Sequence, residues 1–385
     1  MKLVFESSVL AKILADVASV AAQRNTLPIL SNVLLKAQGI IPIQGTTRTT
    51  RSKITIAATD LEIGMVMEVE GEVEEDGEIT IPAKKLLDIV REASPDDKVT
   101  IETLSSDRIA IEYGTAKFKI AGLASDEFPP VPSISDGGVK IKGEKLCTLL
   151  RKVVSGASTE EIRYFLNGVY VIIERFKDIS TDGSITAVGT DGKRLMVATQ
   201  ITGGAITKKI TGIIPVKAVK KIVSMFDHAD MIDVNLLESE LVIGGEGIVF
   251  ITRLIEGEYP DYQAVINPVK NNDLVLDLDK ESFISVIKRV SLLANPKTPS
   301  VRLEAVEGVL TITSSTPDLG EAVECLPVDY SDASIIISLN ARYLLDILQS
   351  VTGKVTLKFR DSLSPVLVLD NDDIGFIGVI MPMRL

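Results

Sequence analysis

Tryptophan is absent from the 385-residue sequence, and aromatic residues make up only 4% of it. There is one histidine, His228, and there are two cysteines, Cys147 and Cys325. These counts exclude a Cys/His metal cluster and allow one disulfide at most, which is typical of a reducing compartment. We therefore expect cores built from Ile, Val and Leu, no metal, no cofactor and a cytoplasmic location.

Long uncharged apolar runs are also missing. The first 23 residues have apolar residues at helical spacing, but Glu6, Lys12 and Asp16 interrupt them, which argues against a signal peptide or a membrane span. Hydrophobic residues at 45% and charged residues at 24% are typical of folded globular proteins and argue against disorder or a coiled coil. The length favours two or three domains.

The sequence repeats itself three times, with a period of roughly 130 residues. A strand running into an apolar-striped helix occurs as LVFESSVLAKIL, VKIKGEKLCTLL and LDLDKESFISVI. A second such signal occurs as EITIPAKKLLDIV, TGIIPVKAVKKIV and IIISLNARYLLDIL, with Pro82, Pro215 and Asn340 where helix starts favour them. We predict three domains, at residues 1–132, 139–267 and 273–385.

Each repeat reads as two helices combined with short Ile/Val/Thr-rich strands, which predicts an α+β fold with antiparallel sheets. The strands include residues 107–113, 168–173 and 238–244. The expected helices span residues 7–23, 83–93, 142–158, 216–227, 279–291 and 340–351.

The predicted helices are net basic, although the whole chain carries −12. Their polar positions hold Lys84, Lys85, Arg91, Lys145, Arg151, Lys152, Lys217, Lys220, Lys221, Lys288 and Arg289. Lysines on a single helix are usually just a solvated face. If all six helices faced one way, however, they would form a basic surface that attracts polyanions, while the acidic remainder repels them.

No catalytic motif is complete. GTDGKRL at 189–195 lacks the spacing of a Walker A loop, and GGEG at 244–247 fits a hairpin turn better than a dinucleotide fingerprint. His228 has no evident nucleophile partner and fits a surface position after a helix. Asp60, Asp191 and Asp318 recur with the repeat, so we expect them to form turns. A hydrolase on repeated α+β units would need a nucleophile and base cluster, and the sequence shows none.

Several segments, taken in order along the whole chain, resemble one family. TLPILSNVLL (26–35), ATDLE (58–62), RYFLNG (163–168), TDGKRL (190–195), EGEYPDY (256–262) and the terminal VIMPMRL (379–385) resemble the bacterial DNA polymerase III beta subunits, the sliding clamps. The resemblance implies three tandem clamp domains per chain and a head-to-tail homodimer that closes into a ring around duplex DNA. The implied function is a processivity factor rather than an enzyme. Its implied partners are sequence-independent duplex DNA, the DNA polymerase III alpha subunit, the clamp loader delta subunit and other proteins with a clamp-binding motif, with no membrane.

The resemblance also assigns residues. Arg24 and Tyr164 match DNA-contacting positions, and the basic helices would line the hole, with Lys84, Lys85, Lys145, Arg151, Lys152, Lys217, Lys220 and Lys221 as DNA-binding residues. Phe165 stands where a second Tyr is familiar, and Glu160 replaces a DNA-contacting Gln. Lys117 and Phe118 would meet Leu292 and Leu293 at the dimer seam, although leucines at a helix end can equally be core.

A peptide pocket is the second implied site. By motif position it comprises Arg163, Leu166, Thr190, Gly192, Arg194, Leu195, Pro260, Val265, Tyr343, Val379, Met381, Pro382 and Met383. Apolar residues and adaptable Met suit varied peptides, and Arg163 and Arg194 would fix polar or acidic ends. From the residues alone, MPM at a C-terminus can equally be a buried last strand. Lys193, Ala264, Thr298 and Pro365 depart from the family pattern, and residues 40–54 resemble a loop insertion. A repeat scaffold that binds only proteins remains the alternative to a clamp.

Overall fold

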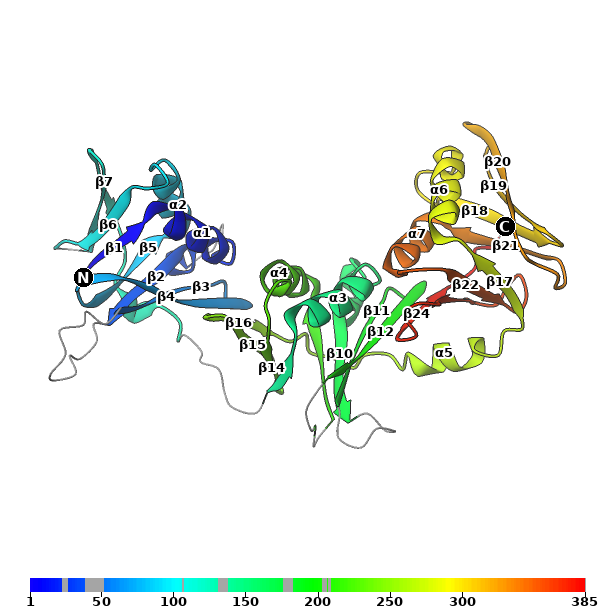
Figure 1. Ribbon diagram of the computed structural model, residues 1–385, viewed down its shortest axis with the longest axis horizontal. Helices are drawn as coiled ribbons and strands as arrows, with labels where there is room; N and C mark the ends of the chain where they lie inside the picture. The colour runs from blue at the N-terminus through cyan, green and yellow to red at the C-terminus, as the bar shows by residue number, and fades with distance from the viewer. Residues whose placement is uncertain are drawn as a thin grey trace. The chain divides into compact units, whose positions relative to one another are not determined.

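The computed structural model describes residues 1–22, 27–38, 52–105, 107–130, 138–175, 183–202, 206 and 209–384 (Figure 1). These residues form two compact units. The first unit combines Met1–Gly138 with Ile232–Arg253, and the second combines Val139–Met231 with Leu254–Leu385. Arg24 and residues 40–51 of the expected insertion lie outside the described residues, so nothing structural bears on them.

The six expected helices are all present, with ends that are shorter by a few residues. They are α1 (Ser7–Ala18), α2 (Ala83–Arg91), α3 (Gly143–Val154), α4 (Val216–Phe226), α6 (Lys280–Val290) and α7 (Ala341–Ser350). The sequence did not reveal α5 (Gln263–Val269), which contains Pro268. Short 3-10 segments are η1 (Pro28–Ser31), η2 (Ser125–Glu127), η3 (Glu161–Leu166) and η4 (Ser291–Leu293).

The first unit contains one large antiparallel sheet. Its strands are β1 (Lys2–Glu6), β2 (Asn32–Gln38), β3 (Ser52–Thr59), β4 (Ile63–Glu75), β5 (Gly77–Pro82), β6 (Lys98–Thr103), β7 (Arg108–Tyr113), β8 (Ala116–Ala121), β14 (Ile232–Leu236), β15 (Glu240–Gly245) and β16 (Ile248–Arg253). The order runs β8-β7-β6-β1-β4-β16-β15-β14, with β3 on β4 and β2 between β3 and β5. The sheet therefore continues from the first repeat into strands of the second through the β4–β16 pair.

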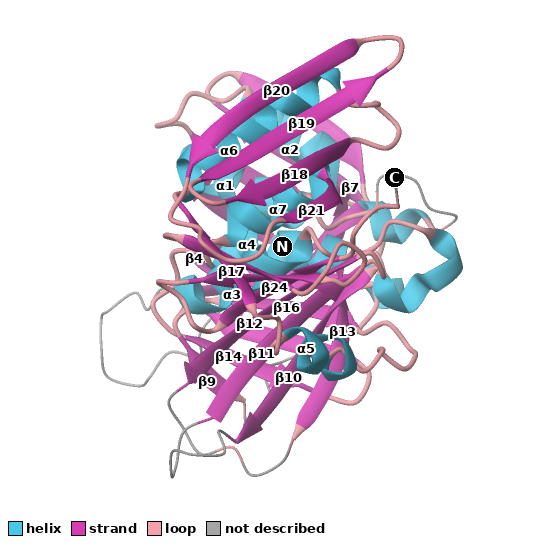
Figure 2. Cartoon of the chain, turned by 90° about the vertical axis from the view of Figure 1, so that its right-hand side faces the viewer, coloured by secondary structure: helices cyan, strands magenta, loops and turns pink. Residues whose placement is uncertain are grey.

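The second unit contains two sheets, and its first strand, β9 (Val139–Ile141), belongs to neither of them. Its strands are β9 (Val139–Ile141), β10 (Gly168–Arg175), β11 (Gly183–Thr190), β12 (Arg194–Thr202), β13 (Ile210–Pro215), β17 (Leu274–Leu278), β18 (Ser300–Val306), β19 (Val309–Thr316), β20 (Gly320–Pro327), β21 (Ile335–Asn340), β22 (Val355–Phe359), β23 (Val366–Asp370) and β24 (Phe376–Ile380). One sheet runs β13-β10-β11-β12-β24-β23-β22-β17, and the other runs β20-β19-β18-β21. In Figure 2, β20 lies at the outer edge of the smaller sheet. Here the β12–β24 pair carries the sheet from the second repeat into the third.

The helices pack in pairs, α1 with α2, α3 with α4 and α6 with α7, and each pair lies near the strands of its own repeat (Figure 1). Their buried residues recur at intervals of three and four, as in Leu146, Leu149, Leu150 and Val153 of α3, which is the spacing of one helical face. The strand pairs within both units are antiparallel, so the α+β prediction is confirmed.

The predicted turns and helix starts are present as well. Asp60 Oδ1 accepts hydrogen bonds from the backbone N–H groups of Glu62 and Ile63, at 3.0 and 2.8 Å. GGEG forms the turn of the β15–β16 hairpin. Asn340 caps α7, because its side-chain oxygen accepts from two backbone N–H groups of the first turn.

Candidate peptide cleft and charged surfaces

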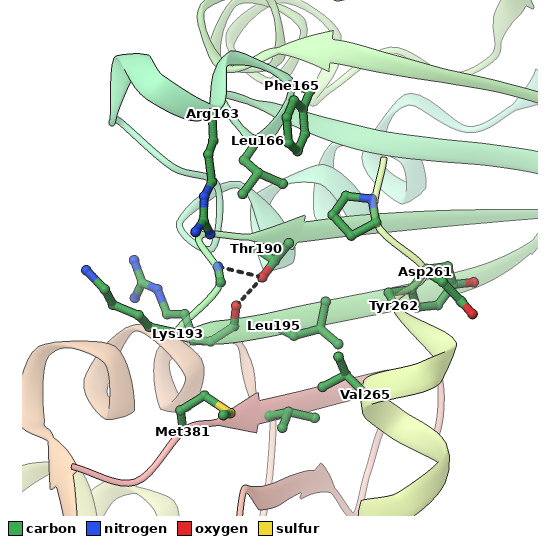
Figure 3. A pocket seen from close by; sticks show the side chains of 14 residues that line it. Arg163, Phe165, Leu166, Thr190, Lys193, Leu195, Asp261, Tyr262, Val265 and Met381 are labelled. Carbon is green, nitrogen blue, oxygen red and sulfur yellow. Dashed lines mark hydrogen bonds between the residues drawn. The ribbon is translucent and has the colours of Figure 1, made fainter. Parts of the chain in front are cut away.

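A cleft of about 350 Å³ opens in the second unit beside the β12–β24 pair (Figure 3). Residues from η3, the β11–β12 turn, β24 and the segment that leads into α5 enclose it. We call it the Arg163 cleft. Its lining residues are Arg163, Phe165, Leu166, Thr190, Gly192, Lys193, Arg194, Leu195, Pro260, Asp261, Tyr262, Val265, Val379 and Met381.

The floor of the Arg163 cleft is apolar and fixed by the core. Leu166, Leu195 and Val379 are buried members of one hydrophobic cluster, whereas Val265 and Met381 stay partly exposed at the opening. In Figure 3, Leu195 and Val265 lie next to each other, with Leu166 facing them from η3. A rigid apolar floor with adaptable Met at its mouth suits the apolar side chains of a short ligand.

The turn between β11 and β12 shapes one wall. Thr190 Oγ1 donates to the carbonyl of Arg194 at 2.5 Å and accepts from the N–H of Gly192 at 3.1 Å. Asp191 Oδ1 accepts from the N–H groups of Lys193 and Arg194 at 2.9 and 3.0 Å. Gly192 has φ 83°, a conformation that glycine adopts without strain, so the TDGKR sequence encodes this wall locally.

Below the cleft, the Tyr259 ring stacks on Tyr170, with 4.8 Å between ring centroids, and its hydroxyl donates to the carbonyl of Val188 at 3.3 Å. Burial raises the pKa of Tyr259, so this phenol stays neutral at physiological pH. Tyr259 therefore supports the segment that carries Pro260, and it contributes no charge to the cleft.

Arg194 makes its contacts within the protein and is not available to bind a ligand. Its buried guanidinium pairs with Asp346 of α7, donates to the carbonyl of Ser155 and lies over the Tyr343 ring, 4.5 Å from the centroid. Its Nε is 3.3 Å from Asp191 Oδ2. The expectation that Arg194 fixes the ends of a peptide is therefore corrected, because carboxylates of the chain itself already neutralise its charge. Arg163, by contrast, is exposed at the opening of the cleft.

Ten of the expected pocket residues line the cleft. Tyr343, Pro382 and Met383 do not: Tyr343 lies beneath Arg194, and the N–H of Met383 is bound to the carbonyl of Ser338 at 2.7 Å. Sequence reasoning did not place Phe165, Lys193, Asp261 and Tyr262 in the cleft. The sequence did contain a signal for Asp261 and Tyr262, because they follow Pro260 directly in the EYPDY segment that marks the end of the second repeat.

Most of the basic helix residues are exposed. Lys84 and Lys85 on α2, Lys145 on α3 and Lys217 and Lys220 on α4 lie at the surface, and Lys221 is partly buried. Tyr164 is 55% exposed. Arg151 is exposed but pairs with Asp227 at 2.7 Å.

Lys152 departs from the sequence-based expectation. It is only 8% exposed, and its ammonium lies 2.5 Å from Asp373 Oδ2 and 3.8 Å from Asp370 Oδ2. A phosphate cannot replace these partners without separating α3 from β23 and β24. Lys152 is therefore a buried structural cation and is removed from the DNA-binding set.

The expected seam residues lie on one edge strand and in the 3-10 segment that follows α6. Phe118 is on edge strand β8 and stacks on Tyr113, with 5.7 Å between ring centroids, while Lys117 is exposed. Leu292 in η4 is 77% exposed, and Leu293 is partly buried. The reading of Leu292 as ordinary core is therefore wrong.

Within the described residues, no group of three or more His, Cys, Asp or Glu side chains is arranged to hold a metal ion. In the same part of the chain, no helix is long and apolar enough to span a membrane. Cys147 is buried in α3, and burial raises the pKa of its thiol to about 12, which leaves it without thiolate character at neutral pH.

Comparisons with known proteins agree with the sequence resemblance along the whole chain. Family profiles described as DNA polymerase III beta subunit, N-terminal, central and C-terminal domain match residues 1–132, 140–261 and 267–384. The beta sliding clamp of Caulobacter vibrioides is 33% identical over 393 residues, with all of both chains covered. That of Chlamydia pneumoniae is 30% identical over 390 residues, covering all of this chain and 99% of the relative.

Comparison with solved structures leads to the same family. The DNA polymerase III subunit beta of Pseudomonas aeruginosa has a TM-score of 0.90 at 28% identity, and the DNA polymerase sliding clamp of Caulobacter crescentus has a TM-score of 0.88 at 33% identity, both with full coverage of both chains. The chain belongs to the DNA polymerase III beta subunit family, the sliding clamps that serve replication as non-catalytic processivity factors.

Proposed function

We propose that two copies of this chain close head to tail around duplex DNA, and that the Arg163 cleft holds short peptide segments of the proteins tethered there. The proposed peptide donors are the DNA polymerase III alpha subunit, the clamp loader delta subunit and other proteins with a clamp-binding motif. The proposal places the protein in the cytoplasm and keeps the three repeat domains at 1–132, 139–267 and 273–385. The observation that carries it is the Arg163 cleft, an apolar trough with an exposed arginine at its rim.

The Arg163 cleft suits a peptide with apolar residues and an acidic or carboxylate end. The buried floor of Leu166, Leu195 and Val379 removes apolar ligand atoms from water, at roughly 25 cal/mol per Å² buried. Arg163 can bind a carboxylate with two parallel hydrogen bonds, whereas the ammonium of the neighbouring Lys193 already pairs with Glu160 at 3.5 Å.

The basic side chains at the surface of the helices are proposed to attract the duplex. The set is Lys84, Lys85, Lys145, Arg151, Lys217, Lys220 and Lys221, with Tyr164 and Arg24 added by family resemblance. Lysines that reach phosphates give a sequence-independent, salt-dependent attraction with little preference for register. A ring retains DNA by topology, so a weak attraction of this kind allows sliding.

The proposed seam joins β8 of one copy to β20 of its partner. Each is the last strand of its sheet, so each presents an unpaired backbone row that another strand can complete. The charges are complementary at Lys119 on β8 and Glu321 on β20, whereas Lys117 and Glu324 already pair with Glu112 and Arg289 of the same chain. Val323 on β20 is 58% exposed and would be covered by the pairing.

A retention experiment tests the ring. Protein loaded on nicked circular plasmid by a clamp loader with ATP should stay bound through gel filtration, and it should be lost when a restriction enzyme linearises the plasmid. A protein-only scaffold would not be retained on the circle. Retention that linearisation leaves unchanged would show gripping rather than encirclement.

A deletion tests the cleft. Removing residues 381–385 takes away Met381, whose N–H donates to the carbonyl of Lys193 at 2.9 Å and closes one wall. We expect loss of binding to a clamp-binding peptide with the dimer intact, measured by fluorescence anisotropy and sedimentation velocity. Undiminished peptide affinity would show that the peptide binds elsewhere.

A further inference from the structure

Arg194 lies where three elements meet: the C-terminal end of α3, the helix α7 and the β11–β12 turn. It is the first residue of β12, and it is only 9% exposed. Its Nη2 donates to the carbonyl of Ser155, the residue that follows α3, and its Nη1 pairs with Asp346 of α7. The ring of Tyr343, also on α7, lies 4.5 Å from the guanidinium carbon. One buried cation therefore joins a helix of the third repeat to two elements of the second.

The first repeat shows that the turn does not need this arginine. Arg194 occupies the repeat position of Ile63, which is 2% exposed. The turns at residues 59–63 and 190–194 have the same hydrogen bonds: the threonine hydroxyl donates to the last carbonyl, and the aspartate accepts from two backbone N–H groups. A buried ion pair often contributes no more to stability than apolar residues of the same volume. The formation of the turn therefore does not account for Arg194.

The contacts of Arg194 lead to the wall of the Arg163 cleft through Asp191. Arg194 Nε lies 3.3 Å from Asp191 Oδ2, while Asp191 Oδ1 accepts from the backbone N–H groups of Lys193 and Arg194. One carboxylate thus contacts the guanidinium with one oxygen and the backbone of the turn with the other. Because both groups are planar, the orientation of the guanidinium fixes the Asp191 side chain, and with it the turn.

Arg163 lies against the same turn. A Cβ added to Gly192 would come to 3.0 Å from Arg163 Nη1, so the guanidinium of Arg163 lies close to the Gly192 backbone. In Figure 3, the Arg163 side chain extends from η3 toward this turn. A displacement of the turn would therefore change the wall of the cleft and the position of Arg163 together.

The helix α7 is held to α3 at a second point. Ser350 Oγ donates to the carbonyl of Lys152 at 2.8 Å. Ser350 lies four residues after Asp346, so the two side chains share one face of α7. Neither is among the described residues that line the Arg163 cleft. Both residues connect α7 to the second repeat, and the ion pair with Arg194 belongs to Asp346.

We propose that Asp346 is a positioning residue for peptide binding in the Arg163 cleft and that it acts through Arg194. Its charge holds the Arg194 guanidinium, which in turn orients Asp191 and the turn that forms the wall. The third repeat thereby sets the shape of a wall that belongs to the second. The inference deepens the proposed function and rests on it, because it concerns the affinity of the same cleft.

The test uses two labelled, end-capped peptides with the same apolar residues, acidic ELVELF and neutral QLVQLF, titrated with the full-length protein by fluorescence anisotropy. Asp346→Asn keeps the shape of the side chain but removes the charge that holds Arg194. We expect this variant to bind both peptides about fivefold more weakly, at the lower end of coupling between two sites, because the amide oxygen still accepts a hydrogen bond.

The pair of peptides separates positioning from charge neutralisation. If Asp346 acted only by neutralising Arg194, its replacement would free a cation beside the cleft. The acidic peptide would then bind more tightly, and the neutral peptide would not change. Weaker binding of both peptides is expected only if the wall itself changes.

The chain offers two matched controls. Asp88→Asn makes the same change in the LLDI sequence of α2, at an exposed position of the first repeat, and should leave both affinities unchanged. Ser350→Ala removes the second contact between α7 and α3, so it should lower the melting temperature without weakening either peptide. A role in stability alone would make Asp346→Asn behave like Ser350→Ala.

A double-mutant cycle tests the route through Arg194. Arg194→Ile introduces the residue that the first repeat carries in this turn, so the turn should still form, but both peptides should bind more weakly. In that background, Asp346→Asn should change either affinity by less than about twofold, because the side chain through which it acts is gone. Hydrogen exchange gives a readout without peptide: the amides of Lys193 and Arg194 should exchange faster in Asp346→Asn than in wild type.

Three results would overturn this inference alone: wild-type affinities in Asp346→Asn, tighter binding of the acidic peptide by that variant, or an undiminished effect of Asp346→Asn in the Arg194→Ile background. Failure of the proposed function would look different. Wild type would then bind neither peptide, or Arg163→Ala would bind the acidic peptide as tightly as wild type does. Either of those results would remove the Arg163 cleft as the peptide site, and this inference with it.

Discussion

Replacing Lys152 by methionine should destabilise the second unit and leave DNA attraction unchanged. Methionine keeps most of the apolar stem but removes the ammonium, which lies 2.5 Å from Asp373 and 5.5 Å from the Phe376 ring centroid. Breaking a buried ion pair by removing one partner costs about 3–5 kcal/mol. Two features reduce that figure here: the Asp373 side chain is 38% exposed, and Asp370 keeps its hydrogen bonds from Thr352. We therefore expect a loss of about 2–3 kcal/mol.

Lys145→Met on the same helix is the matched control. Lys145 is exposed, so its loss should change the free energy of unfolding by no more than about 0.5 kcal/mol. It should, however, lower the slope of log affinity for a short duplex against log salt by roughly 1 for each copy. Urea unfolding followed by circular dichroism measures the free energy of unfolding, since the chain has no tryptophan for fluorescence. Fluorescence anisotropy of the short duplex at several salt concentrations measures the slope of log affinity against log salt.

The reasoning would be refuted if Lys152→Met unfolded like wild type or lowered the salt slope as Lys145→Met does. Acid unfolding adds a check with a definite sign. Burial by itself would raise the pKa of Asp370, but hydrogen bonds from Thr352 and Asp372 and the charge of Lys152 lower it overall from 3.8. A carboxylate with a lowered pKa contributes stability above its unfolded pKa and loses that contribution as the pH falls through the folded pKa. Below about pH 4 the stability of wild type should therefore fall more steeply than that of Lys152→Met.

Three further outcomes are expected. Asn340→Ala removes the side-chain acceptor that caps α7 and should cost about 1 kcal/mol in urea unfolding, whereas Asn340→Asp should retain most of it. Gly257→Ala forces a side chain at φ 136° and places Cβ 3.2 Å from that of Phe165, so it should lower the melting temperature and weaken acidic-peptide binding together; an unchanged melting temperature would contradict the conformational argument. Val323→Asp on β20 should raise the dimer dissociation constant about thirtyfold or more in sedimentation equilibrium, because a carboxylate would be buried at the seam, and an unshifted constant would place the seam elsewhere.

Sequence periodicity was sufficient for the six helices that carry an apolar stripe. The apolar stripe of Leu146, Leu149, Leu150 and Val153 identifies the buried face of α3. Such a stripe can be read from the sequence because it depends only on the spacing of neighbours along the chain. Turns were equally local, since Asp60 and Asp191 bind backbone groups two and three residues ahead of them. Helix ends were less accurate, and α5 was missed because Pro268 within it reads as a helix breaker.

The cleft was predictable only in part. Resemblance placed ten lining residues correctly, because they lie in contiguous motifs around turns and strand ends. For one of these ten, Arg194, it misassigned the role, because its partner Asp346 lies 152 residues further along the chain. The motif shows that an arginine is present, and only the packing of α7 against the turn shows that its charge is already neutralised.

Repeats, helices and turns follow from the sequence by itself, because hydrophobic spacing and Asp or Gly turn chemistry act within a few residues. Tertiary structure decided which of the charged side chains on those elements remain available. Lys152 and Lys145 are indistinguishable in a helical pattern, yet one meets a carboxylate 221 residues away and the other meets solvent. Burial and electrostatics depend on which side chains lie close in space, and the spacing of residues along one helix does not contain that information.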